Sequence, residues 1–458
     1  MKTKSAILLG KTIFTASRLL KLGGGYAAPG LHALKVDSYL IQNLATQIPI
    51  NIFITGTNGK TTTSSLLAHV LKKQNLKVIR NSTGSNLERG IASTLLMHAS
   101  LTGKISADIG VWEVDEAAFN TLLPKIKPQI TIFLNAFRDQ LDRYGEVDTV
   151  IKKWWHTLEK VNWKMQIITN QGDVNTGYIG SISKLNHHIQ NLSYFVKDHL
   201  MDNEMSLNQK MKPEFKGDIN AQLISQQDLS STSFKITYPT GNIQAKLNLP
   251  GIYNIYNCLA VFCTWFSLNL PIKIFPSLLN DFTPSFGRVE KLKYKEKELI
   301  LFLIKNPVGT TQVLETIMPV VKKDDVLLTA LNDNFADGTD VSWIWDAEFE
   351  ALTSTQYELA KMKQRTSSAI KKEKSKKNTE FKEIFVTGTR AYDLALRLKY
   401  ASVDPKRITI DHNLNNAFEN AIKSSSSRIF LLLTYTAMLE MQKLLKDLGV
   451  KKDYWRTE

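Results

Sequence analysis

The sequence predicts an α/β protein made of two consecutive units, each built around a largely parallel sheet. From residue 51 onward, apolar strand segments, glycine-containing turns and apolar-periodic helical segments alternate, which is the pattern of parallel α/β domains. The same alternation starts again after residue 288. A chain of 458 residues has room for about three domains with cores of their own.

Three segments follow one another along the chain. Residues 1–48 hold helical stretches around glycine and proline turns, and we expect them to pack on the first unit. Residues 49–288 form that unit, with strands expected at 52–55, 109–114, 130–134 and 166–169 and a polar insertion or small β-rich excursion at about 199–232. Residues 289–458 form the second unit, with strands expected at 326–330, 383–387, 407–410 and 428–433.

The net charge of +15 is unevenly distributed. Nine basic and two acidic residues lie between Lys361 and Lys382, so this segment carries nearly half of the excess charge, and we expect it to be an exposed loop. A basic chain can bind nucleic acid, but base recognition needs aromatic stacking platforms or a reading helix. Phe381 is the one aromatic residue of the segment. We therefore expect no nucleic-acid partner.

The location of the protein follows from two further patterns. The two cysteines cannot form a disulfide framework, which favours the reducing cytoplasm. The uncharged stretch 247–272 is long enough to cross a bilayer, but its prolines and asparagines favour a loop leading into a buried helix. The basic and apolar N-terminal residues suit a core helix better than a signal peptide, with a helix lying on the membrane surface as the alternative.

The strongest local motif is the segment from Thr55 to Thr63, which reads T-G-T-N-G-K-T-T-T between an apolar strand and a helix. Its glycines let backbone N–H groups point at phosphate oxygens, and the helix N-terminus adds its positive end. Lys60 can reach the β- and γ-phosphates, and the Thr61 hydroxyl can hold Mg²⁺. The loop is shortened, because Ile54 stands where the longer form has glycine.

A second candidate group follows the next strong strand. Glu113 and Asp115 lie at its carboxyl end, which is where open parallel sheets bind ligands. A carboxylate there can hold or steer a magnesium ion. We therefore expect Glu113 and Thr61 to share Mg²⁺ beside the phosphate loop.

Several motifs in order resemble the Mur ligase family. They are the shortened phosphate loop, the Glu113 strand, the segments 135–146 and 251–254, and Gly287-Arg288. The segments 306–309, 333–338, 342–346, 387–393 and 434–438 are similar to the MurT branch of that family. The resemblance covers nearly the whole chain. It implies a Mur-ligase-like central P-loop ATPase domain with a parallel-rich sheet, followed by a C-terminal Rossmann-like α/β domain.

The resemblance also implies an activity. A MurT-type subunit uses ATP and Mg²⁺ to activate the D-glutamate α-carboxylate of lipid II as an acyl phosphate. Ammonia from a separate GatD-type glutaminase, the other half of a heterodimer, then gives D-isoglutamine. Lipid II would be met at the inner face of the membrane, so the enzyme would be cytoplasmic and peripheral to that face.

Further residue roles are carried over by the same resemblance. ATP would be bound by Gly56, Thr57, Asn58, Gly59, Lys60, Thr61, Thr62, Asn254 and Arg288, with Asn254 at the adenine and Arg288 at the ribose or phosphates. The alternatives are that Asn254 is a helix cap and Arg288 forms a surface salt bridge. Many MurT chains carry a four-cysteine zinc ribbon, but residues 199–232 contain no cysteine. We therefore expect no bound zinc.

The cluster Asp333, Asp337, Asp340 and Asp346 holds candidates for a third site. Aspartates commonly fill turns and cap helices, but Asp346 follows an apolar Trp-Ile-Trp segment whose rings could shield its carboxylate. A glutaminase cysteine and histidine work best when a carboxylate orients the imidazole. The MurT–GatD resemblance implies that this carboxylate comes from the synthetase subunit. Asp346 is our first choice and Asp337 the second.

Two other functions stay open at this point. An amino-acid-adding Mur or folylpolyglutamate-type ligase would have much the same central domain, because fold and phosphate loop do not fix the acceptor. A non-catalytic scaffold could bind nucleotide and a glutaminase without turning ATP over. Assays that supply either an amino acid or ammonia, together with ATP turnover, separate these functions.

Overall fold

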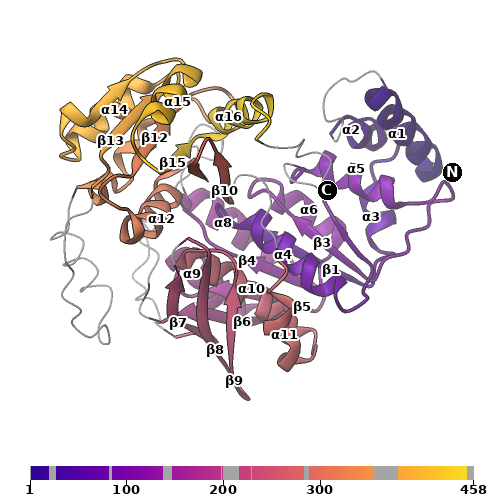
Figure 1. The fold of residues 1–458 in the computed structure, drawn as a ribbon. Helices are drawn as coiled ribbons and strands as arrows, with labels where there is room; N and C mark the ends of the chain where they lie inside the picture. The colour runs from indigo at the N-terminus through magenta and orange to yellow at the C-terminus, as the bar shows by residue number, and fades with distance from the viewer. Residues whose placement is uncertain are drawn as a thin grey trace.

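The computed structural model describes residues 2–19, 27–81, 85–137, 147–197, 199, 216–227, 229–282, 288–353 and 380–450. Within them the chain forms two separate sheets with helices on both faces, and a group of N-terminal helices beside the first sheet (Figure 1). The predicted α/β fold class is therefore confirmed. The basic loop lies outside the described residues, except for its last few positions.

The first sheet is parallel over most of its width. Among the described residues its strand order is β2-β3-β1-β4-β5-β6-β7-β8-β9, and only β7, β8 and β9 pair antiparallel. The strands are β1 (Ile50–Thr55), β2 (Val78–Arg80), β3 (Ile109–Glu113), β4 (Ile130–Phe133), β5 (Met165–Asn170), β6 (Ile189–Val196), β7 (Ile219–Gln227), β8 (Ser231–Tyr238) and β9 (Gly241–Leu247). The polar segment 199–232 thus contributes β7 and the first two residues of β8 to an antiparallel meander at one end of this sheet.

Alternating side chains of β1 divide the first unit into two apolar layers. Ile52 and Ile54 face one layer, which also contains α4 (Lys60–Lys72), α10 (Ile252–Ser267) and α11 (Phe275–Leu278). Phe53 faces the other, which contains α5 (Glu88–His98), α6 (Phe119–Ile126), α8 (Val147–Leu158) and α9 (Val174–Ile182). The N-terminal helices α1 (Lys2–Leu19), α2 (Ala28–Val36) and α3 (Leu40–Ala45) join this second layer. A strand buried on both faces explains the continuous apolar sequence of β1.

The second sheet has the order β10-β11-β15-β12-β13-β14 in the described residues, and all its pairs except β10–β11 are parallel. Its strands are β10 (Arg288–Tyr294), β11 (Lys297–Leu303), β12 (Val326–Ala330), β13 (Glu383–Thr387), β14 (Ile408–Ile410) and β15 (Arg428–Leu433). The helices α12 (Pro307–Ile317) and α14 (Ala391–Tyr400) cover one face, and α15 (Leu414–Lys423) and α16 (Tyr435–Asp447) cover the other.

The uncharged stretch after β9 forms helix α10, which is buried along nearly its whole length. No helix among the described residues is both long enough and apolar enough to span a membrane.

Candidate functional site

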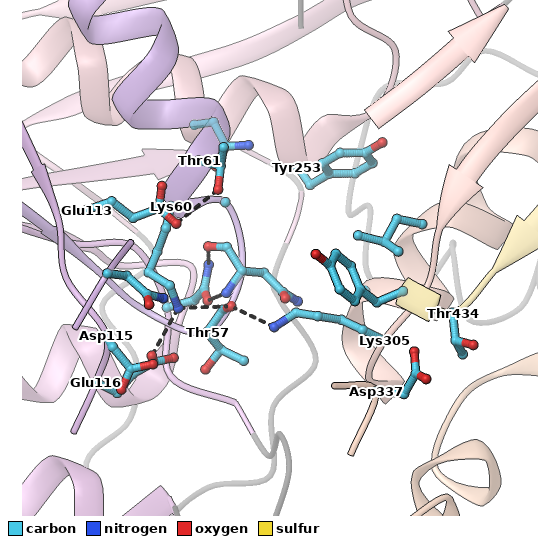
Figure 2. A pocket seen from close by; sticks show the side chains of 18 of the residues that line it. Thr57, Lys60, Thr61, Glu113, Asp115, Glu116, Tyr253, Lys305, Asp337 and Thr434 are labelled. Atoms are coloured by element: carbon cyan, nitrogen blue, oxygen red, sulfur yellow. Dashed lines mark hydrogen bonds and ion pairs between the residues drawn. The ribbon is translucent and has the colours of Figure 1, made fainter. Parts of the chain in front are cut away.

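A cavity of about 720 Å³ lies where the carboxyl edges of the two sheets face each other. The first sheet contributes the loop after β1, the ends of β3 and β4, and the start of α10. The second contributes the loops after β11, β12 and β15. Figure 2 shows Lys60 and Thr61 on one side and Lys305, Asp337 and Thr434 on the other. Carboxyl ends of parallel strands are the usual ligand-binding edge of such sheets.

Two glycines let the loop after β1 fold back over the sheet. Gly56 has a φ of +134°, and a Cβ at this position would come within 2.7 Å of the Asn135 carbonyl oxygen. Gly59 has a φ of +89°, and its Cβ would lie 2.2 Å from the Asn257 side-chain oxygen. Both positions combine a backbone conformation that favours glycine with a close approach of a neighbour. The predicted phosphate loop therefore has the shape that its sequence indicated.

Helix α4 starts directly at the loop and points its N-terminus at the cavity. Its first backbone bond runs from the Thr63 N–H to the Gly59 carbonyl at 2.9 Å, so the N–H groups before Thr63 have no helix carbonyl to bond. The N–H of Asn58 instead donates to the Asn135 side chain at 2.8 Å, which fixes the loop to the end of β4. Phosphate binds at a helix start of this kind.

The position of Lys60 in a glycine-containing loop predicts that it faces solvent, but the structure buries it. It is the first residue of α4 and only 9% exposed, and its ammonium group lies 3.0 Å from Glu116 and donates to the Gly56 carbonyl. Burial alone would lower the pKa of Lys60. The charges of Glu116 and Asp115 outweigh this effect and raise its pKa above the ordinary value. Lys60 is therefore held as a cation against a carboxylate that the sequence did not single out.

Thr61 and Glu113, which we expect to share Mg²⁺, lie within hydrogen-bonding distance of each other. The Thr61 hydroxyl donates to Glu113 Oε1 at 2.9 Å, and Glu113 ends β3, directly beside Ile54 of β1. The second carboxylate oxygen, Oε2, is buried with no hydrogen-bond partner. Leaving a carboxylate oxygen buried and unsatisfied is costly, and a bound cation would remove that cost. A hydroxyl and a carboxylate oxygen beside a phosphate site suit Mg²⁺, which keeps most of its remaining ligands as phosphate and water.

The second sheet reaches the phosphate loop through residues that the sequence analysis assigned no role. Lys305, in the turn between β11 and α12, donates to the Thr57 carbonyl at 3.4 Å (Figure 2). The side chains of Asn58 and Asn306 pair reciprocally, with N···O distances of 3.1 and 3.0 Å. Asn306 also caps α12 by accepting from the Gly309 N–H at 2.8 Å. The Asn306-Pro307 dipeptide was the one available signal, because Asn before Pro marks a helix start.

Of the other predicted nucleotide contacts, Asn254 and Thr62 differ in whether they line the cavity. Asn254 lines the cavity, but its side chain forms hydrogen bonds within the protein. It donates to the Pro250 carbonyl and accepts from the Asn257 side chain. Thr62 is buried in α4 and is not among the residues that line the cavity. Arg288 begins β10, and its side chain lies outside the described part of the chain. Tyr253, beside Asn254, also lines the cavity and gives it an aromatic wall.

Asp337 lines the second-sheet side of the cavity and is only 7% exposed. Its carboxylate accepts from both the backbone N–H and the hydroxyl of Thr436, at the start of α16. Burial raises the pKa of Asp337, and these hydrogen bonds only partly oppose the shift. Nearby, the Asn332 side-chain oxygen accepts from the Thr389 N–H at 3.0 Å, and the Asn332 N–H donates to the Thr434 hydroxyl at 3.0 Å. Asp337 is thus part of a hydrogen-bonded layer that joins three loops at this edge.

Asp346 lies elsewhere, and the expectation that tryptophan rings shield it was wrong. It follows a short 3₁₀ helix (Ser342–Trp345), is exposed, and is not among the residues that line the cavity. Trp345 is itself 48% exposed, and its ring packs edge-on against Tyr400 and beside the Arg397 guanidinium of α14. The 3₁₀ turn directs the indole to α14, which the sequence pattern did not indicate.

Nothing in the described residues resembles a zinc centre. No three His, Cys, Asp or Glu side chains in these ranges gather closely enough to hold a metal ion. Cys258 and Cys263 are buried in α10, and burial raises the pKa of both thiols far above their ordinary value. That the protein binds no zinc stays a prediction, which elemental analysis after dialysis against a mild chelator would test.

Two family models match this chain. The Mur ligase middle domain matches residues 54–265, and the MurT ligase C-terminal domain matches residues 303–373 and 369–438. Among solved structures, MurF from Acinetobacter baumannii superposes with a TM-score of 0.66 at 16% identity, covering 92% of this chain and 80% of that one. MurF from Thermotoga maritima in complex with ADP gives a TM-score of 0.61 at 15% identity, covering 91% and 85%. At these identities the likeness concerns the fold.

Two relatives with higher sequence identity match most of the chain. The lipid II isoglutaminyl synthase (glutamine-hydrolyzing) subunit MurT of Streptococcus pneumoniae is 30% identical over 97% of this chain and 97% of its own. The subunit of the same name from Staphylococcus aureus is 31% identical over 88% and 89%.

Proposed function

The chain belongs to the MurT family of ATP-dependent Mur ligases, and from this premise we propose that it is the synthetase subunit of a lipid II isoglutaminyl synthase. In this step of peptidoglycan synthesis, the α-carboxylate of D-glutamate in lipid II becomes the amide of D-isoglutamine. The observation that carries the proposal is a phosphate loop that opens into a cavity shared with the MurT-type second unit.

The chemistry requires two steps, because a carboxylate is a poor electrophile. In the first, a carboxylate oxygen attacks the γ-phosphorus of ATP, ADP leaves, and an acyl phosphate forms. In the second, ammonia attacks the carbonyl carbon, inorganic phosphate leaves with the electron pair of the broken C–O bond, and a proton is lost. Both steps depend mainly on positioning and charge neutralisation.

The residues around the cavity are suited to those tasks. The first N–H groups of α4 and the Lys60 ammonium would hold the phosphates, and Lys305 would approach them from the second sheet. Thr61 and Glu113 would hold Mg²⁺, as the unpartnered Glu113 oxygen indicates. When bound, this ion neutralises phosphate charge. Of the sequence-based candidates, we keep Asn254 and Arg288 as nucleotide contacts to be tested.

The ammonia is proposed to come from a GatD-type glutaminase that forms a heterodimer with this chain. The word "subunit" in the names of both relatives supports a partner. We retain Asp346 as the carboxylate that orients the glutaminase histidine, with Asp337 as the runner-up. Exposure now favours Asp346, because a residue that completes a site on another chain must be reachable from it. Buried Asp337 already serves two hydrogen bonds to Thr436.

The decisive experiment is a reconstituted amidation assay. The chain is co-expressed with a candidate glutaminase, and lipid II, ATP, Mg²⁺ and glutamine are supplied. Formation of D-isoglutamine with release of ADP and phosphate is expected. Amide formation with an added amino acid, but not with ammonia, would favour an amino-acid-adding ligase. Absence of any ATP turnover in the assembled complex would favour the non-catalytic scaffold.

A further inference from the structure

We propose that helix α1 binds the surface of an anionic membrane and so docks the enzyme on the bilayer. The helix buries one side, with Ala6, Ile7 and Gly10 packed into the second apolar layer. The opposite side carries Leu8, which is 58% exposed, and Leu19, which is 79% exposed. These two leucines lie eleven residues, or about three turns, apart, so they share one side of the helix.

A stripe of cations runs beside these leucines. Lys4, Lys11 and Arg18 follow one another at intervals of seven residues, which places them along one flank after every two turns. Lys11 is half-buried and donates to the Met97 carbonyl at 3.4 Å, whereas Lys4 and Arg18 are exposed. The side chains of Lys4 and Arg18 can extend to lipid phosphates while the leucines enter the boundary between headgroups and acyl chains. This is the arrangement of a helix that lies in the plane of a membrane surface.

The charge around the helix favours an anionic partner. Residues 1–48 contain six Lys or Arg residues and a single acidic residue, Asp37. Asp37 is buried and accepts a hydrogen bond from Thr3 at 2.6 Å, so it does not offset the cations at the surface. Clusters of basic residues next to apolar ones are attracted to the negative potential of anionic lipids. Helix α1 itself has no acidic residue.

Two threonines between the leucines direct their hydroxyl groups at the backbone of the same helix. Thr12 and Thr15 donate to the carbonyls of Leu8 and Lys11, four residues earlier, at 2.9 and 3.0 Å. A hydroxyl satisfied in this way does not need water, and the threonine methyl group stays available to an apolar surrounding. The outward side of α1 is therefore less polar than its sequence suggests.

The helix is tied to the cavity through α2 and α5. Gly30 of α2 donates its N–H to Ser93 of α5 at 2.7 Å, and a Cβ on Gly30 would lie 1.9 Å from the Arg89 carbonyl oxygen. Leu87 and Arg89, where α5 begins, line the cavity. Figure 1 shows α1 at the periphery, beyond α2 and α5. A membrane bound at α1 would thus lie on the side of the molecule that carries the first-sheet wall of the site.

Co-sedimentation with vesicles tests this inference without the substrate. Purified full-length protein is mixed with vesicles of equal parts phosphatidylglycerol and phosphatidylcholine, and with vesicles of phosphatidylcholine alone. We expect binding to the anionic vesicles only, weakening with added salt. Replacing both Lys4→Gln and Arg18→Gln should weaken it by about 30-fold, since each cation near such a surface contributes about fivefold. Replacing Leu8→Ser and Leu19→Ser should weaken it by about tenfold or more.

Matched controls use equally exposed residues far from α1. Leu185→Ser and the pair Lys152→Gln and Lys153→Gln should bind vesicles like the wild type. Circular dichroism and ATP turnover without membranes report whether each variant is folded. If the wild type fails to bind anionic vesicles, or if the α1 variants bind as it does, the inference is wrong. Because no lipid II is present, such a failure leaves the proposed amidation untouched.

Discussion

The two sheet edges that face the cavity differ in how their polar groups are satisfied. On the first sheet, groups are left open toward the cavity, namely the N–H groups at the start of α4 and Glu113 Oε2. On the second sheet, the Thr387 hydroxyl is buried with no hydrogen-bond partner, but the charged and amide side chains of Asn332, Asp333 and Asp337 bond to one another's loops through Thr389, Arg390 and Thr436. A polar edge that leaves groups open is prepared for a ligand, whereas a saturated edge holds loops in place. The comparison predicts chemistry at the first edge and support at the second.

The largest loss of activity is expected at Asp346, which belongs to the second unit but lies at neither of the two sheet edges that face the cavity. Asp346→Asn should lower glutamine-dependent amidation by about 10⁴-fold, because losing the orienting carboxylate of a triad has that consequence. Amidation from ammonium salts should partly survive, as should binding of ATP and the partner. Asp447→Asn, at an exposed aspartate of the second unit, serves as the matched control. A parallel loss of glutamine and ammonia activities would assign Asp346 to the synthetase site or the fold.

At the open edge, Lys60→Ala should lower ATP turnover by about 10³-fold, since a preorganised charge on the transferred phosphoryl group is lost. The variant also leaves Glu116 buried without its cation, which can cost about 3–5 kcal/mol of stability. The double variant Lys60→Met and Glu116→Gln should recover the thermal stability but not the turnover. Turnover that recovers together with stability would show that Lys60 acts only through the fold.

Removing the open carboxylate should have a smaller effect. Glu113→Gln is expected to lower kcat by about 100-fold and to raise the Mg²⁺ concentration needed for half-maximal activity. Thr61→Ser keeps the hydroxyl and should stay near the wild type, whereas Thr61→Ala should resemble Glu113→Gln. An unchanged magnesium titration in Glu113→Gln would remove the ion from this position.

The contact between the two edges can be weakened alone. Asn306→Ser keeps a side-chain oxygen to cap α12 but is too short to pair with Asn58. We expect about a fivefold rise in KM for ATP, because both hydrogen bonds of the pair are lost at about 0.5 kcal/mol each, with an unchanged melting temperature. Asn306→Ala also loses the cap and should melt earlier. Equal KM values in wild type and Asn306→Ser would mean that the pair does not couple the loop to the second unit.

The smallest expected effect concerns the saturated edge and pH. A hydrogen bond from Thr389, together with Arg390, lowers the pKa of Asp333, and a hydrogen bond from Arg390 lowers that of Asp393, both from 3.8. The stability they contribute is therefore present above pH 3.8 and is lost as pH falls through the folded-state values. Arg390→Gln should cost less than about 1 kcal/mol at pH 7, because these groups are partly exposed. Its stability should depend less on pH below 3.8, which acid unfolding followed by circular dichroism would measure.

The sequence by itself determined the fold class, eight of the fifteen strands that the described residues form, and the phosphate loop. These features depend on local chemistry, so a continuous segment of the sequence is enough to predict them. Apolar runs specify strands buried on both faces, and Gly56 and Gly59 specify a tight loop before a helix. The meeting of Thr61 with Glu113 could also be predicted, because parallel strands place their carboxyl ends together.

Only the tertiary structure decided how charges and rings are paired across distant segments. Lys60 looked like a loop residue open to solvent, but Glu116, 56 residues away, holds it in a buried ion pair. Lys305 and Asn306 reach the phosphate loop from the other unit, a contact that no local pattern encodes. Trp345 turned to Tyr400 instead of covering Asp346, because ring packing depends on which helix lies beside it. Such pairings are set by the packing of whole elements, and sequence spacing carries no record of them.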